Sequence, residues 1–101
     1  MNLTKTEIKA LQKSANYLFE YPKDMYFVFD IIKDSCIGNK HYLFLCKTQE
    51  DVVECFRNHS KNIVNYDFHK ICYGKFTENG FLLSKISQSK IDDHCYQEYQ
   101  F

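Results

Sequence analysis

The chain has 101 residues, of which 45% are hydrophobic, and this is enough for one domain with a single modest core. Its 13 basic and 13 acidic residues cancel, which excludes the strongly basic composition of tight non-specific DNA-binding proteins. The five cysteines, an odd number without paired spacing, indicate reduced thiols. Neither a membrane-spanning run nor the apolar core of a signal peptide is found, so we expect a cytoplasmic protein without a membrane partner.

The first half of the chain predicts a helix followed by a hairpin. Thr4 and Glu7 have the spacing of a capping box, and apolar residues then recur at helical spacing, which predicts a helix over residues 4–20. The β-branched and aromatic residues 25–32 predict a strand. A turn-forming segment separates it from residues 41–46, which we expect to pair antiparallel with the first strand.

The second half repeats this order. Thr48 and Asp51 have N-cap spacing before an apolar face, which predicts a second helix over residues 49–60. Two apolar, β-prone runs within residues 66–86 then flank Asn79-Gly80. Asn and Gly both tolerate positive φ, so this pair predicts a hairpin with a two-residue type I′ turn.

That turn fixes a register in which Thr77 faces Leu82 and Phe76 faces Leu83. The whole pattern predicts an α+β fold of order α-β-β-α-β-β, with a four-stranded antiparallel sheet and helices on one face. We expect one domain: an N-terminal helical extension at residues 1–22, a ββαββ core at 25–86 and a C-terminal tail at 89–101, in which Ser89 could cap a short third helix.

Four cysteine and histidine residues form the best metal-binding candidate. Cys55 and His59 share a predicted helix face, and His69 and Cys72 follow on a predicted strand. Residues three apart on a strand point to opposite sides of the sheet. We therefore favour buried thiols and ordinary surface histidines, and we predict neither a metal site nor a cofactor.

The sequence offers little support for an enzyme. It has no Walker loop, no G-x-S-x-G and no H-E-x-x-H. Cys72 or Cys95 beside His69 or His94 has the residue types of a nucleophile and its base, but nothing selects either pair. The cluster Asp92-Asp93-His94 could hold a divalent ion or transfer protons, but consecutive acids more often lie in water or at the start of a helix. We expect a protein without catalytic residues.

Lysines and aromatic residues provide the candidate binding surfaces. Lys5, Lys9 and Lys13 lie four apart along one side of the first predicted helix, where they could contact phosphates or simply face water. A second group combines lysines and an aromatic ring on the second hairpin, and it could grip a nucleic-acid backbone and stack bases or form the wet side of a sheet. Its members are Lys70, Tyr73, Lys75 and Lys85.

The tail contains a third candidate surface. Tyr96, Tyr99 and Phe101 could anchor a protein partner, because tyrosine is enriched in binding hot spots, or they could pack back onto the domain.

From Met25 onward, the order of short motifs resembles the small nonstructural protein of gokushovirus-type single-stranded DNA phages. The motifs are Tyr26-Phe27-Val28-Phe29-Asp30, Phe44 to Thr48, Glu50 to Arg57, Asp67-Phe68, Ile71 to Phe76 with Gly74, and Asn79-Gly80. Residues 1–22 have no counterpart in this pattern. The resemblance implies a phage protein made in the host cytoplasm and linked with viral DNA synthesis or DNA binding, and it implies no catalytic residue.

Two functions follow from these observations. The first is a non-enzymatic phage protein that acts on or near viral DNA. The alternative is a protein inhibitor that blocks a host enzyme or an antiviral complex, such as a CRISPR effector or a nuclease, by surface shape. Exposed strand edges are also compatible with a homodimer.

Overall fold

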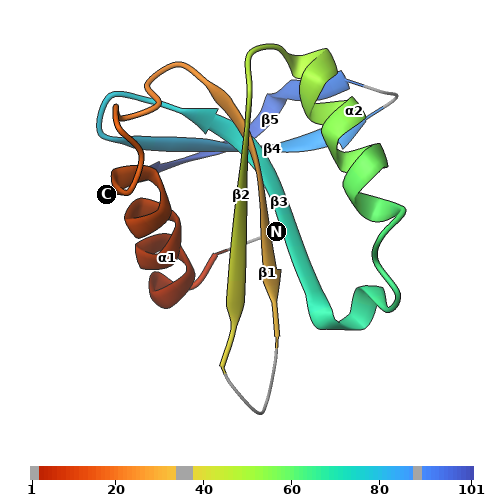
Figure 1. The fold of residues 1–101 in the computed structure, drawn as a ribbon. Helices are drawn as coiled ribbons and strands as arrows, with labels where there is room; N and C mark the ends of the chain where they lie inside the picture. Colours follow the sequence, from red (N-terminus) through yellow and green to blue (C-terminus); the bar gives the residue numbers. More distant parts are fainter. Residues whose placement is uncertain (1–2, 34–37, 88–89) are drawn as a thin grey trace.

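The computed structural model describes the backbone of residues 3–33, 38–87 and 90–101, and the side chains of these residues except 85–96. Two helices and five strands form the fold (Figure 1). Their bounds are α1 (Lys5–Asn16), β1 (Tyr26–Ile32), β2 (Lys40–Cys46), α2 (Gln49–Ser60), β3 (His69–Phe76), β4 (Gly80–Ser87) and β5 (Lys90–Gln100), and a 3₁₀ turn, η1 (Tyr66–Phe68), precedes β3. No helix within the described residues is long and apolar enough to cross a membrane.

The strands form a single antiparallel sheet in the order β2-β1-β3-β4-β5. The predicted α+β class and antiparallel sheet are confirmed, but the sheet has five strands instead of four. Because β2 and β3 both pair antiparallel with β1, they run parallel to each other. Parallel strands need a crossover connection, and α2 provides it.

One face of the sheet packs against α1. Phe27, Phe29 and Ile31 alternate along β1 and are fully buried in one apolar cluster with Leu11 and Ala15 of α1. The Phe27 ring lies against the ring of Phe76 at 4.6 Å between centroids, and other core side chains come from β3 and β4. Each Phe side chain buries a large apolar area, so this cluster is the main core of the protein.

The opposite face of the sheet packs against α2. Val28 of β1 lies in a second cluster with Cys46 and with Val52 of α2. The two helices therefore cover opposite faces, as Figure 1 shows with the sheet between them. The prediction of both helices on one face is wrong. β1 is apolar at nearly every position, so it presents hydrophobic side chains on both faces of the sheet, and each face is covered by a helix.

Helix α1 begins as predicted and ends earlier than predicted. Thr4 Oγ1 accepts a hydrogen bond from the Glu7 N–H at 3.2 Å, and Glu7 Oε1 accepts one from the Thr4 N–H at 2.8 Å, which completes the capping box. The helix ends at Asn16 instead of residue 20. Leu18 and Phe19 continue the helical spacing of apolar residues, but they are exposed and gain no packing energy from a longer helix.

The β3–β4 hairpin forms with a different register from the predicted one. Phe76 faces Phe81, and the Thr77 N–H donates to the Gly80 carbonyl at 2.9 Å, so Glu78-Asn79 is the turn. Gly80 lies in β4, where a Cβ atom would collide with the backbone of Tyr99 in β5. Glycine is therefore needed at this position because the two strands approach closely, and not because the backbone adopts a positive φ. The shift is two residues, so every side chain keeps its predicted face.

The C-terminal tail is a strand and not the third helix that its spacing suggested. β5 pairs with β4, and a register shift lies between Leu83 and Lys85. The Tyr99 ring stacks on Phe81 with 4.9 Å between centroids, and Phe101 lies 5.4 Å from the same ring. Tyr99 and Phe101 are two residues apart, so they satisfy the strand period, and the edge of β4 gives them a partner strand.

Candidate functional site

Asp30 is the one buried charged or polar residue of the described core, with no exposed surface. It lies in the middle of β1, and alternation along the strand places it on the α2 face, next to Val28. A carboxylate in such an apolar environment is costly unless it is paired or hydrogen-bonded. Its partners therefore mark the most unusual polar site of the fold.

Two histidines provide those partners, and we name Asp30, His59 and His69 the Asp-His cluster. His59 Nε2 lies 2.6 Å from Asp30 Oδ2, and His69 Nδ1 lies 3.0 Å from Oδ1 and 2.9 Å from Oδ2. α2 contributes His59 from its last turn, and β3 contributes His69 as its first residue. The cluster thus joins β1 to two other elements.

Both imidazoles are partly accessible, with 18% of the His59 side chain and 13% of the His69 side chain exposed. The Phe44 ring lies 4.8 Å from the His59 ring, so β2 borders the cluster as well. One ligand atom from each of Asp30, His59 and His69 lies within 4.8 Å of the others. The arrangement can form a hydrogen-bonded network between a carboxylate and two rings, or it can hold an ion.

The metal-binding candidate of the sequence, Cys55 and His59 with His69 and Cys72, is only partly assembled. His59 and His69 lie together at Asp30. Cys72 is buried on the opposite face of the sheet, in the apolar cluster under α1 that contains Leu11 and Phe27 (the α1-side cluster), as the strand alternation led us to expect. Cys55 lies by Cys46 and packs on the α2-side cluster. The interpretation of His59 and His69 as ordinary surface residues is wrong, because most of each side chain is buried and both contact Asp30.

The described thiols are poor nucleophiles. Burial raises the pKa of Cys46 and of Cys72 to about 12, and burial also raises the pKa of Cys55. A thiol with a raised pKa stays protonated near neutral pH, whereas attack requires the thiolate. Cys95 and the acidic segment 92–94 with His94 lie outside the described side chains.

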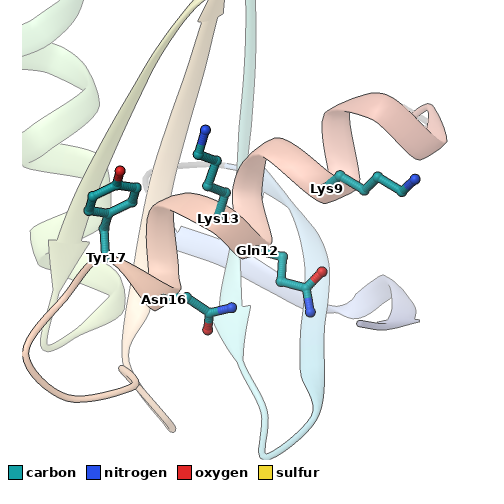
Figure 2. A pocket seen from close by; sticks show the side chains of 5 residues that line it. All are labelled: Lys9, Gln12, Lys13, Asn16 and Tyr17. Atoms are coloured by element: carbon teal, nitrogen blue, oxygen red, sulfur yellow. The ribbon is translucent and has the colours of Figure 1, made fainter.

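The exposed side of α1 carries the first lysine candidate. Lys5, Lys9 and Lys13 are all exposed. Lys9 and Lys13 line an open depression together with Gln12, Asn16 and Tyr17. Figure 2 shows that Lys13 and Tyr17 point in the same direction from the helix.

Glu7, the only acidic residue within α1, turns away from these lysines. Its Oε1 atom accepts a hydrogen bond from Lys70 Nζ of β3 at 2.7 Å. Partial burial alone would raise the pKa of Glu7, but the hydrogen bonds from Lys70 and Thr4 lower it, so the carboxylate stays charged and paired. The exposed side of α1 is therefore a basic surface.

The second hairpin does not present its candidate residues on one surface. Lys70 reaches Glu7 on the α1 side, whereas Tyr73 packs against the Phe56 ring of α2 with 5.3 Å between centroids. Burial raises the pKa of the Tyr73 hydroxyl. Lys75 Nζ lies 5.3 Å from the centroid of the Tyr26 ring, which is a cation–π contact. The Lys85 side chain lies outside the described ones.

The aromatic residues of the tail lie mostly against the core. Tyr99 and Phe101 both pack on the α1-side cluster, and the Tyr99 hydroxyl lies 3.0 Å from Gln97 Oε1. Tyr96 lies outside the described side chains.

Asp30 was not among the site residues predicted from the sequence. The only sequence feature that indicates it is a single acidic residue within an apolar predicted strand. In the resemblance to the phage proteins, Asp30 appears only as the last residue of a motif. No protein-family profile matches the chain, and comparison with curated proteins and with solved structures finds no match.

Proposed function

We propose that the chain is a non-enzymatic, phage-encoded binding protein that acts on or near viral DNA in the host cytoplasm. The exposed side of α1 is the surface that contacts single-stranded DNA. The resemblance to gokushovirus nonstructural proteins supports the phage and DNA assignments.

The basic side of α1 carries the proposal. Lys5, Lys9 and Lys13 repeat every four residues, which spaces them about 6 Å apart along the helix axis. Their positive charge is not offset within the helix, because Glu7 is paired with Lys70. Only the charges that face the phosphates determine the electrostatic affinity, so the zero net charge of the chain does not oppose binding here.

Tyr17 supplies the second element of such a surface. Its side chain is 81% exposed and lies beside Lys13 in the depression of Figure 2. Aromatic rings next to lysines are typical of single-strand binding, because bases stack on the ring while the lysines contact the backbone.

Fluorescence anisotropy with a labelled single-stranded oligonucleotide tests this function. For three phosphate contacts, we expect log K to fall with log salt concentration with a slope of about −2. The double variant Lys9→Gln/Lys13→Gln should reduce the slope to about −0.7, because one lysine contact is left. Tyr17→Ala should weaken binding by roughly tenfold without changing the slope, since it removes a stacking contact.

Lys61→Gln is the matched control, because Lys61 is an exposed lysine at the end of α2, on the other side of the sheet. It should leave both affinity and slope unchanged. Association that does not depend on salt, or an equal loss in the control, contradicts DNA contact through α1.

A protein partner is the second candidate function, and it corresponds to an inhibitor of a host enzyme or antiviral complex. Leu18 and Phe19, which follow α1, favour this candidate, because both large apolar side chains are exposed and Phe19 is fully so. A pull-down from host lysate should recover a stoichiometric protein with the wild type and lose it with Phe19→Ser. Recovery of nucleic acid alone contradicts this candidate.

A further inference from the structure

The Asp-His cluster offers a set of metal ligands that the DNA-binding proposal does not use. Asp30, His59 and His69 come from three different elements, and their ligand atoms converge within 4.8 Å. Two imidazoles and one carboxylate are the ligand set of several open divalent metal sites. We propose that this cluster binds one divalent transition-metal ion of the zinc type.

The distances within the cluster are close to those that an ion requires. Metal–ligand bonds of about 2.0–2.2 Å in tetrahedral geometry place ligand atoms roughly 3.4 Å apart. The separations from Asp30 Oδ2 to His59 Nε2 and His69 Nδ1 are 2.6 and 2.9 Å. The two imidazole nitrogens lie within 4.8 Å of each other. Coordination therefore requires side-chain movements of up to about 1.4 Å, which lengthen the two contacts with Asp30 and bring the two rings closer together.

The setting of Asp30 also favours an ion. Its carboxylate has no exposed surface, and a buried charge is normally paired or coordinated to a metal. A divalent cation would compensate that charge directly, whereas the imidazoles are charged only when protonated. The partial exposure of both rings, 18% and 13%, makes the cluster accessible to an ion from solvent.

The cysteines lie outside this ligand set. Cys72 is buried on the opposite face of the sheet, and Cys55 packs with Cys46 away from the three ligand atoms. The ligand set therefore predicts nitrogen and oxygen coordination without thiolate. That difference can be observed spectroscopically, because a thiolate ligand gives Co²⁺ an intense near-ultraviolet charge-transfer band.

The experiment uses the full chain without a polyhistidine tag, freed of metal with a chelator and kept reduced. Calorimetric titration with Zn²⁺ should give one ion per chain. Titration with Co²⁺ should give visible d–d bands without the thiolate charge-transfer band. His59→Gln and His69→Gln should each weaken Zn²⁺ binding by more than about tenfold, because each removes a direct ligand.

His41→Gln is the matched control, because His41 is on β2 and stacks on Phe29, with 5.8 Å between the ring centroids, outside the cluster. It should bind Zn²⁺ like the wild type. Circular dichroism establishes that each histidine variant is folded. The test does not use Asp30→Asn, because changing a fully buried carboxylate could unfold the protein.

Three outcomes would overturn the proposal. The wild type could bind no ion, which would leave the cluster as a hydrogen-bonded network. The histidine variants could retain full affinity, or the Co²⁺ complex could show thiolate coordination. Each outcome is independent of oligonucleotide binding, since Lys9 and Lys13 lie on α1, on the other face of the sheet.

Discussion

At the scale of single residues, the buried thiols have the clearest chemical consequence. Burial raises the pKa of Cys46 and of Cys72 from 9.0 to about 12. Their folded-state pKa therefore lies above that of the unfolded chain. The stability that they contribute is complete below pH 9 and is lost as the pH rises from about 9 toward 12.

We expect iodoacetamide at pH 8 to leave Cys46 and Cys72 unmodified in the folded protein, because almost no thiolate forms there. Peptide mass spectrometry after timed labelling measures this. The same peptides should be fully modified in concentrated urea, where both thiols regain their ordinary pKa. Equal labelling rates with and without urea would show that the folded chain does not protect them.

Residue-level prediction from the sequence succeeded where local chemistry decides and failed where distant residues meet. The N-cap function of Thr4 follows from neighbours three residues away. Asp30 acquires its role from histidines that are 29 and 39 residues distant in sequence. No local pattern indicates which histidines reach a buried acid, so the Asp-His cluster could not be predicted.

At the scale of elements, the start of α1 combines a cap with a tertiary contact. Thr4 and Glu7 cap each other, and Glu7 also binds Lys70 of β3. The capping box therefore fixes both the first turn of α1 and its attachment to the sheet.

Thr4→Ala should lower the free energy of unfolding by about 1 kcal/mol, because the Glu7 N–H loses its acceptor. Glu7→Gln should cost less than Glu7→Ala, since glutamine can still accept the hydrogen bond from the Thr4 N–H. Urea denaturation followed by circular dichroism measures these changes. Thr6→Ala, at an exposed position of the same turn, should change stability little.

The existence and order of both helices and of the β1–β2 and β3–β4 hairpins were predictable because their signals are local. Helix α2 spans Gln49–Ser60, as its N-cap and apolar spacing indicated. The tail sequence was also compatible with a short third helix, because Ile91, Cys95 and Tyr99 recur every four residues. The tail forms a strand because the edge of β4 lies beside it and pairs with it, and this neighbour cannot be recognised from the tail sequence alone.

At the scale of the whole molecule, the sheet separates two apolar clusters. Ile31 belongs to the cluster under α1, and Val52 belongs to the cluster under α2. Their placement could not be predicted, because a strand that is apolar at nearly every position does not indicate which helix covers which face.

Ile31→Val should cost about 1 kcal/mol and Val52→Ala about 2 kcal/mol of unfolding free energy. In the double variant, these costs should add within about 0.5 kcal/mol, because the two side chains share no partner. Denaturation in urea of the two single variants and the double variant measures the coupling. Val28→Ala with Val52→Ala, two residues of one cluster, should show clear non-additivity.

Asp30 has one more consequence, for how β1 finds its alignment in the sheet. Residues on both sides of Asp30 are apolar and buried. Hydrophobicity alone therefore distinguishes poorly between the two orientations of the strand, in which alternate sets of side chains face α1 or α2. Sliding β1 by one residue would turn Asp30 into the cluster of Leu11 and Phe81, away from both imidazoles. An unpaired carboxylate there would cost several kcal/mol, and this penalty favours the observed face of β1 over the opposite one.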